Sequence, residues 1–329
     1  ATRLTSINLP NKLQIINDHL FGSCHQLKEV IMCQSITEIR SKAFSCCESL
    51  EKIVFSNEIT TIKDYAFSEC LSLTELILPN KLENIWYKFI SKCSNLTTIT
   101  IPKNLKSITS FQQISYPFSE SSISKVIFEE GTVNIVDSIL NGRILTLKEV
   151  IIPNSVSSIG NYSFCDCSSL KQINIPENVS IIGQFAFAGT GLITITLPNK
   201  LKIISNNLFG GCNQMKSIIL PNNIPEIQKE AFYNCIRLEK IELPNEILYI
   251  GASAFYNCKQ LTELILPNKL ESIGANFISR CTKIINITIP KSLKKLSSRI
   301  YPFYGSSIRK VIFEDGVKKI INSILGGNV

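Results

Sequence analysis

Residues 147–169 read LKEVIIPNSVSSIGNYSFCDCSS, and this line is the unit from which nearly the whole 329-residue chain is built. We number its residues 1 to 23. Apolar residues stand at positions 1, 4 and 6, a proline at 7, apolar residues again at 10 and 13, a phenylalanine at 18 and a cysteine at 21. Lines of this pattern start at Leu4, Leu27, Leu50, Leu73, Leu96, Leu147, Leu170, Leu192, Met215, Leu238, Leu261 and Ile284. A repeat of this period predicts a solenoid.

The spacing within one line predicts its local structure. Alternation over positions 3 to 6 predicts a short strand with one face inward, and the proline at 7 ends that strand because it has no N–H to donate. Positions 10 and 13 predict a second short extended segment or turn, and positions 14 to 20 a helical or 3-10 turn. One line cannot bury its own apolar side, so the lines must stack. We therefore expect a single solenoid domain over 1–329, with about 14 coils of 23 residues.

The consensus L-x-x-I-x-L-P-x-x-L-x-x-I-x-x-x-A-F-x-x-C-x-x resembles the leucine-rich repeat of the BspA-like class, also called the Treponema pallidum type. The resemblance implies a leucine-rich-repeat solenoid of the α/β class, rich in strands, with a concave parallel sheet on one side and short strands with helical or 3-10 turns on the other. It also implies a cell-surface or extracellular location, and a role in adhesion and in binding host extracellular proteins.

A longer repeat lies above the short one. Residues 73–93 and 261–281 carry the same residue at 16 of 21 positions, at an offset of 188, or eight coils. Residues 116–118 are echoed by 301–303 at an offset of 185. The chain thus contains about one and three-quarter copies of an eight-coil unit. Because its ends are too short for capping repeats, we expect a fragment of a longer protein or a partner that covers the ends.

Most of the cysteines occupy one place in the coil. Nine of the twelve stand at position 21, namely Cys24, Cys47, Cys70, Cys93, Cys167, Cys212, Cys235, Cys258 and Cys281. A fixed place predicts a column of small buried side chains. Parallel side chains and an odd count favour thiols over disulfides, and the paired C-x-x-C spacing of a zinc site is absent. We expect the phenylalanines at position 18 to form a second core column.

Positions 3 and 5 point outward if 1, 4 and 6 point inward. Position 5 is isoleucine or valine in eight of fourteen lines. The candidate partner-binding residues are Ile31, Val54, Ile77, Ile127 and Ile151 at position 5, with Glu75, Lys125 and Glu149 at position 3. Two interpretations stay open: β-branched residues stabilise the strand surface, or an apolar stripe between charges binds a protein.

The irregular coils supply further candidates. The line from Leu96 runs 27 residues, lacks its cysteine and carries an aromatic loop, which the later copy repeats. The candidate residues are Tyr116, Phe118, Tyr301 and Phe303. Loops on a rigid scaffold often carry function, although a bulged coil could instead adjust the curvature of the solenoid.

Composition narrows the function class. The chain is 44% apolar and 18% charged, and no run approaches the roughly 18 apolar residues of a membrane span. Its net charge of +8 comes almost wholly from residues 283–329, which contain nine basic residues and only two acidic ones, Glu314 and Asp315. A polyanion could bind this basic end, but a solvated basic surface is the simpler interpretation.

No enzyme motif is present. Glycine-rich phosphate loops, H-E-x-x-H and G-x-S-x-G are all missing, and the chain has only two histidines, His19 and His25. We expect no catalytic, cofactor-binding or metal-binding residues. The sequence favours a non-enzymatic protein-binding or adhesion module of a cell surface, which binds a host or matrix protein through its concave sheet and irregular loops. The alternative is a structural or intracellular scaffold in which the solenoid is a spacer between other domains.

Overall fold

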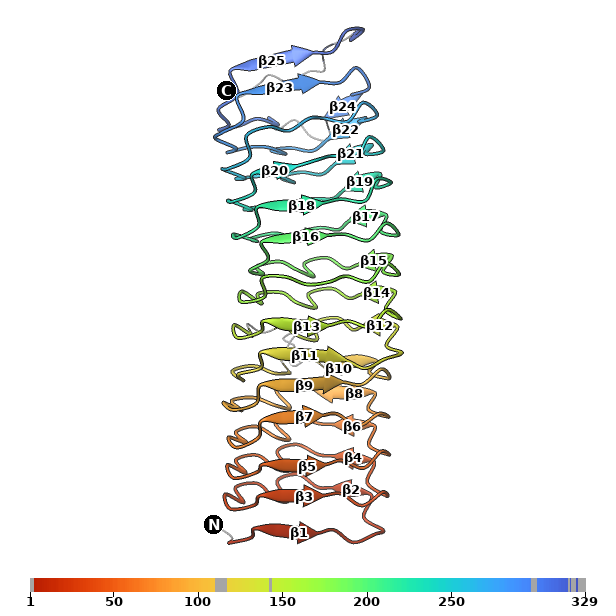
Figure 1. Ribbon diagram of the computed structural model, residues 1–329, viewed down its shortest axis with the longest axis vertical. Helices are drawn as coiled ribbons and strands as arrows, with labels where there is room; N and C mark the ends of the chain where they lie inside the picture. Colours follow the sequence, from red (N-terminus) through yellow and green to blue (C-terminus); the bar gives the residue numbers. More distant parts are fainter. Residues whose placement is uncertain are drawn as a thin grey trace. The chain divides into compact units, whose positions relative to one another are not determined.

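The computed structural model describes residues 3–109, 117–141, 144–296, 301–318, 320 and 324. They fall into two compact units. Unit 1 comprises Ala1–Val156 and Ser163–Leu170, and unit 2 comprises Ser157–Tyr162 and Lys171–Val329. Both units consist of stacked coils with parallel strands (Figure 1). The single domain over 1–329 that the repeat predicts stays a prediction.

Unit 1 contains two ladders of parallel strands. Its first ladder comprises the sheets β1-β3-β5 and β7-β9-β11-β13, and its second ladder is the sheet β10-β8-β6-β4-β2. The first-ladder strands are β1 (Ser6–Asn8), β3 (Glu29–Ile31), β5 (Lys52–Val54), β7 (Glu75–Ile77), β9 (Thr98–Ile101), β11 (Lys125–Phe128) and β13 (Glu149–Ile151). The others are β2 (Ile15–Ile16), β4 (Glu38–Ile39), β6 (Thr61–Ile62), β8 (Asn84–Trp86), β10 (Ser107–Thr109) and β12 (Asn134–Ile135).

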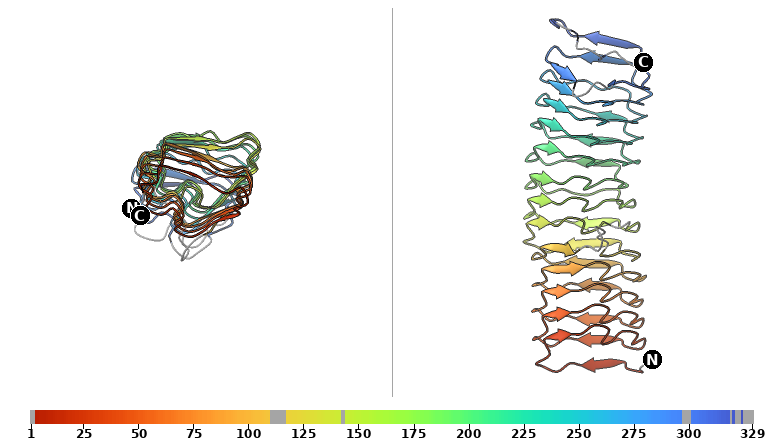
Figure 2. Two further views of the ribbon diagram at one scale, coloured as in Figure 1. Left: turned by 90° about the horizontal axis from the view of Figure 1, so that it is seen from below. Right: turned by 180° about the vertical axis from the view of Figure 1, so that it is seen from behind.

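Unit 2 repeats this plan, and Figure 2 shows its strands from behind. Its first ladder comprises the sheets β16-β18-β20 and β23-β25, with β16 (Thr194–Thr196), β18 (Ser217–Ile219), β20 (Lys240–Ile241), β23 (Asn286–Ile289) and β25 (Lys310–Phe313). In its second ladder β14 (Ser158–Ile159) pairs with β15 (Ile181–Ile182), and a five-stranded sheet joins β17 (Ile203–Ile204), β19 (Glu226–Ile227), β21 (Tyr249–Ile250), β22 (Ser272–Ile273) and β24 (Lys295–Leu296).

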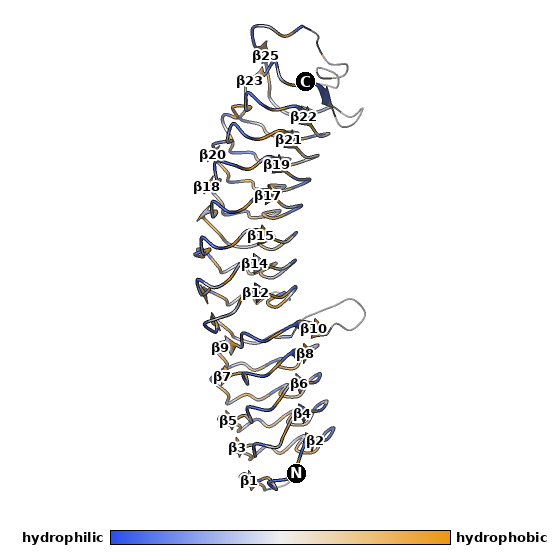
Figure 3. Ribbon diagram, turned by 90° about the vertical axis from the view of Figure 1, so that its right-hand side faces the viewer, coloured by the Kyte–Doolittle hydropathy of each residue, from blue (hydrophilic) through white to orange (hydrophobic). Residues whose placement is uncertain are grey.

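The strand register confirms the 23-residue period. Ile7 pairs with Val30, and Val30 pairs with Ile53, one coil further on. Thr98 pairs with Lys125, 27 residues later, so the long coil joins the same ladder in regular register. Apolar and polar segments recur along the coils in Figure 3. The solenoid of leucine-rich repeats predicted from the sequence is therefore present.

The helical or 3-10 turns predicted for positions 14 to 20 are wrong in detail, because no helix occurs in the part of the chain that the structure describes. Positions 16 and 20 adopt left-handed backbone, as at Lys42 and Cys46 with φ of 56° and 59°. The N–H of Phe44 donates to Ala66 O of the next coil at 2.8 Å, while that of Ser45 donates to Lys42 O at 3.1 Å. Such residues break a helix and direct alternate N–H groups to the neighbouring coil.

The phenylalanine column is present in both units. In unit 1 the ring of Phe44 stacks on Phe21 and Phe67, with centroids 5.1 and 5.2 Å apart. In unit 2 the ring of Phe232 stacks on its neighbours at 5.6 and 5.2 Å. These side chains are buried. One coil therefore completes the core of the next, as stacking of units without their own core requires.

The cysteine column contributes hydrogen bonds as well as volume. Cys47 Sγ donates to Phe21 O at 3.2 Å in unit 1, and Cys258 Sγ donates to Phe232 O at 3.3 Å in unit 2. All twelve cysteines, which lie in the described residues, are thiols. Burial raises the pKa of the Cys47 and Cys93 thiols to about 12. The sequence predicted their burial but not this donor role, which only the path of the adjacent coil reveals.

None of the described segments is a helix long and apolar enough to span a membrane.

Candidate binding surface

Strand alternation places positions 3 and 5 on the outer face of the first ladder. In β7, Glu75 and Ile77 are exposed while Leu76 between them is buried. The same order holds in β13, where Glu149 and Ile151 flank buried Val150. Because successive side chains of a strand point to opposite faces, one core-facing residue exposes both of its neighbours. This face is the candidate binding surface.

In unit 1 the surface carries an apolar stripe, defined as Ile31, Val54, Ile77, Ile127 and Ile151. The exposed fractions are 65% for Ile77, 53% for Ile31, 41% for Ile151 and 40% for Val54, and Ile127 is half-buried. Sequence analysis singled out these five residues, and the structure brings them to one face of unit 1. Their exposure leaves apolar area that a protein could cover.

A column of charges runs beside the unit 1 stripe. Lys52 Nζ lies 3.0 Å from Glu29 Oε1, and Lys125 Nζ lies 3.0 Å from Glu149 Oε1. The side chain of Glu75 is exposed and makes no hydrogen bond or ion pair within the described residues. Ion pairs this exposed contribute little to the free energy of unfolding. The column therefore matters for the charge pattern of the face more than for stability.

In unit 2 the stripe is interrupted. Ile265, Ile219 and Ile312 are 71%, 61% and 40% exposed. Between the first two lies Glu242, whose Oε1 is 2.7 Å from Lys240 Nζ. The hydrogen bond and charge of Lys240 lower the pKa of the Glu242 carboxyl. The unit 2 face is thus part apolar and part charged.

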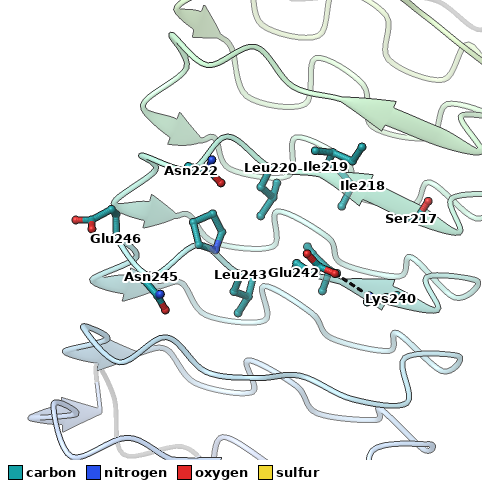
Figure 4. Close-up of a pocket in the computed structure, with 12 residues that line it drawn as sticks. Ser217, Ile218, Ile219, Leu220, Asn222, Lys240, Glu242, Leu243, Asn245 and Glu246 are labelled. Carbon is teal, nitrogen blue, oxygen red and sulfur yellow. Dashed lines mark ion pairs between the residues drawn. The ribbon is translucent and has the colours of Figure 1, made fainter.

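A shallow depression of 710 Å³ lies on this part of unit 2, between two adjacent coils (Figure 4). It is lined by Ser217, Ile218, Ile219, Leu220, Asn222, Lys240, Ile241, Glu242, Leu243, Pro244, Asn245 and Glu246. The lining has aliphatic side chains, one ion pair and amides, but no histidine or cysteine. The repeat pattern carries no signal for this depression, because it depends on how two adjacent coils lie together.

The aromatic loop residues separate into two groups. Phe118 and Phe303 have no exposed surface and pack edge-on against Phe89 and Phe277, with centroids 5.4 and 5.9 Å apart. The prediction that these two residues bind a partner is corrected, because both rings continue the core column of phenylalanines in the longer coils. Tyr301 is 40% exposed, and Tyr304 beside it is 50% exposed. Tyr116 lies outside the described residues.

The basic end of the chain is partly neutralised. Lys294 Nζ lies 2.6 Å from Glu271 Oε1. Lys283 Nζ donates to the uncharged amide oxygen Oε1 of Gln260 at 2.5 Å and so stays a net positive charge. Arg309 and Lys310 are exposed. Binding of a polyanion to this surface stays a prediction.

Nothing in the described part of the chain forms a metal site, since no three His, Cys, Asp or Glu side chains gather there. His25 Nδ1 instead lies 3.3 Å from Glu48 Oε1 at the surface.

Ion pairs between adjacent coils are a further feature that sequence analysis overlooked. Lys81 Nζ lies 2.7 Å from Glu58 Oε2 in unit 1, and Lys269 Nζ lies 2.7 Å from Glu246 Oε1 in unit 2. Both pairs join residues 23 positions apart. The 23-residue spacing between opposite charges could have predicted these pairs, because the same position in adjacent coils lies side by side.

The coil, its register and its exposed strand face define a leucine-rich-repeat solenoid protein. The model of the BspA type leucine rich repeat region matches residues 1–114, 110–216 and 202–328, so the chain belongs to this family. A leucine-rich repeat protein from Bacteroides ovatus has 23% sequence identity and a TM-score of 0.65, covering 96% of this chain and 91% of that one. Another from Eubacterium ventriosum has 21% identity and a TM-score of 0.55, covering 98% and 87%.

These solved structures show the same fold at low sequence identity. No curated protein sequence matches the chain.

Proposed function

We propose that this chain is a non-enzymatic protein-binding module whose contact surface is the outer face of the first ladder. The exposed isoleucine stripe carries the proposal. Ile77 on strand β7 of unit 1 exposes 65% of its surface, and Ile265 at the same coil position in unit 2 exposes 71%. Covering apolar area contributes about 25 cal/mol per Å², and the charges beside the stripe supply orientation.

The proposed partner is a host or extracellular matrix protein, and the proposed location is a cell surface. The resemblance to the BspA-like class supports both. Tyr301 and Tyr304 of the second irregular coil form a separate proposed contact, since both are exposed. Phe118 and Phe303 have no part in it because they are buried.

Capture from host plasma and matrix proteins tests the proposal. The immobilised chain should retain a saturable partner, and the double variant Ile77→Glu with Ile127→Glu should weaken that binding at least about tenfold. The matched control is Ile181→Glu with Ile203→Glu, which changes exposed isoleucines of the second ladder and should bind as the parent does. Absence of any saturable partner would instead favour a spacer between other domains. Equal binding by both double variants would show that the stripe does not contact the partner.

A further inference from the structure

On the outer face of the four-stranded sheet of unit 1, the two strands that flank β9 carry opposite charges at the same height, Glu75 on β7 and Lys125 on β11. The outward side chains of three strands of this sheet are Glu75 and Ile77 on β7, Thr98 and Thr100 on β9, and Lys125 and Ile127 on β11, and β13 adds Glu149 and Ile151 beyond β11. Isoleucine stands on both sides of Thr100, while a carboxylate and an ammonium stand on the two sides of Thr98. β7 and β11 both pair with β9. They therefore lie at the same distance from it, roughly 4.8 Å.

We propose that a second copy of this chain binds to this face through a two-fold axis that runs along β9. Such an axis reverses the order of the coils and keeps the direction of the strands. Glu75 then faces Lys125 of the second copy, and Lys125 faces Glu75 of the second copy. The isoleucines of β7 and β11 meet in the same way, and the threonines of β9 meet on the axis. An interface of this kind is isologous, as most homodimer interfaces are.

Several other registers within the four-stranded sheet place like charges together. An axis along β7 sets Glu75 against itself, and an axis along β11 sets Lys125 against itself. An axis midway between β9 and β11 sets Glu75 against Glu149. Like charges facing each other across an interface are unfavourable. An axis midway between β11 and β13 sets Lys125 against Glu149, but these two groups already pair within the chain, and Glu75 then gains no partner. Within the four-stranded sheet, the axis along β9 is therefore the register that sets Glu75 against an opposite charge.

Both charged groups are available for the contact. Glu75 has no partner within the described residues. Lys125 holds one ion pair, with Glu149 at 3.0 Å, and an ammonium group has three N–H donors. One strand further out, Lys52 on β5 and Glu149 on β13 also have opposite signs. The second copy thus supplies a partner to a carboxylate that the fold leaves without one.

The size of the face sets the strength of the dimer. Four strands span roughly 15 Å, and strands of three or four residues are at most roughly 13 Å long. The face therefore covers roughly 200 Å², against about 800 Å² per partner in a standard interface. The dimer should therefore be weak and reversible. The inference rests on the proposed function, because it uses the same exposed strand side chains, but it names a different partner for the unit 1 face.

Sedimentation equilibrium of the full chain from about 10 to 500 μM tests the inference. The parent should dimerise, and E75K or K125E alone should raise the dissociation constant about tenfold, since each places two pairs of like charges across the axis. An equimolar mixture of E75K and K125E should return to within about threefold of the parent, because both pairs are attractive in the mixed dimer. The control Glu130→Lys, in the turn after β11, changes net charge equally and should dimerise as the parent does.

A chain that stays monomeric over this range overturns the inference, as does a dimer that E75K leaves intact or a mixture that stays monomeric. Circular dichroism confirms that each variant is folded. The outcomes separate from those of the capture experiment: a monomer that still captures a host protein contradicts only the dimer, whereas a dimer that captures nothing contradicts only the proposed host partner.

Discussion

Coil 73–93 of unit 1 and coil 261–281 of unit 2 share 16 of 21 residues, yet their surroundings differ. Both carry a glutamate and an isoleucine at positions 3 and 5, on strand β7 in unit 1 and on a segment outside the strands in unit 2. Ile77 and Ile265 are exposed to similar extents, 65% and 71%. The coil before each differs at position 5, which is Val54 in unit 1 and Glu242 in unit 2. The two copies keep the same residues in the core columns, because each core side chain packs on those of the adjacent coils. An exposed residue such as that at position 5 can differ without disturbing this packing.

Position 14 shows a second difference between the copies. Unit 1 has Lys63 and Trp86 there, and unit 2 has Gly251 and Gly274. A Cβ on Gly251 would lie 2.4 Å from Lys229 N, and one on Gly274 would lie 2.1 Å from Ala252 N. The unit 2 coils approach closely at this turn, and only glycine permits that approach.

The largest expected effect is the pH dependence of stability that arises from the column of buried thiols, which both copies share. Burial raises the pKa of Cys93 to about 12 in unit 1 and raises the pKa of Cys258 well above 9 in unit 2. The folded chain keeps these protons where the unfolded chain loses them. The free energy of unfolding should therefore be constant below pH 9 and fall as the pH rises towards 12, by up to about 1.4 kcal/mol per pH unit for each thiol.

Urea unfolding between pH 7 and 10.5 measures this fall. A variant with Cys70→Ala and Cys93→Ala serves as the control, because it should be less stable at pH 7 but lose stability with a shallower slope. A pH-independent parent would contradict the burial of the column.

Removing the aromatic side chain from either irregular coil should be the next largest effect. Phe118→Ala and Phe303→Ala should each lower the free energy of unfolding by about 3–5 kcal/mol, since both rings are fully buried. Tyr304→Ala, at an exposed neighbour, should change it by less than about 0.5 kcal/mol. If Phe303→Ala were as mild as Tyr304→Ala, the aromatic loop would belong to the surface.

Alanine at position 14 should distinguish the two copies. Gly251→Ala should destabilise by about 1–3 kcal/mol, because its Cβ meets backbone of the adjacent coil. Lys63→Ala, at the equivalent place in unit 1, loses an ion pair with Glu38 at 2.9 Å and should cost less than about 1 kcal/mol. Thermal unfolding of both variants measures the difference, and equal losses would mean that the coils approach equally closely in both units.

Exchanging the residues at position 5 should have the smallest effect on stability and should decide between the two interpretations of the stripe. Val54→Glu and Glu242→Val should each change the free energy of unfolding by less than about 0.5 kcal/mol. Affinity for a captured partner should fall with the first variant and rise with the second. A loss of more than about 1 kcal/mol in Val54→Glu, with affinity unchanged, would support a stripe that only stabilises strands.

Sequence alone determined the coil, its register and the residues that face inward. Leu76 and Phe44 could be assigned to the core because burial follows the period of the repeat, and any shift of one residue would expose every core side chain. The same alternation predicted that Ile77 is exposed. The lack of a partner for the Glu75 carboxylate did not follow from the sequence. Lys52 stands at the same position one coil earlier, and only the structure shows that it pairs with Glu29 instead.

Only the tertiary structure decided the features that depend on how adjacent coils lie. The left-handed backbone at Lys42, the thiol hydrogen bond of Cys47 to Phe21 and the burial of Phe118 belong to this class. Their partners are a coil or more away, and hydrophobic spacing reports which side of a coil faces the core but not the path of the backbone between its apolar positions. The repeat therefore predicted the solenoid, while contacts between coils determined its turns, its bulges and the limits of its binding surface.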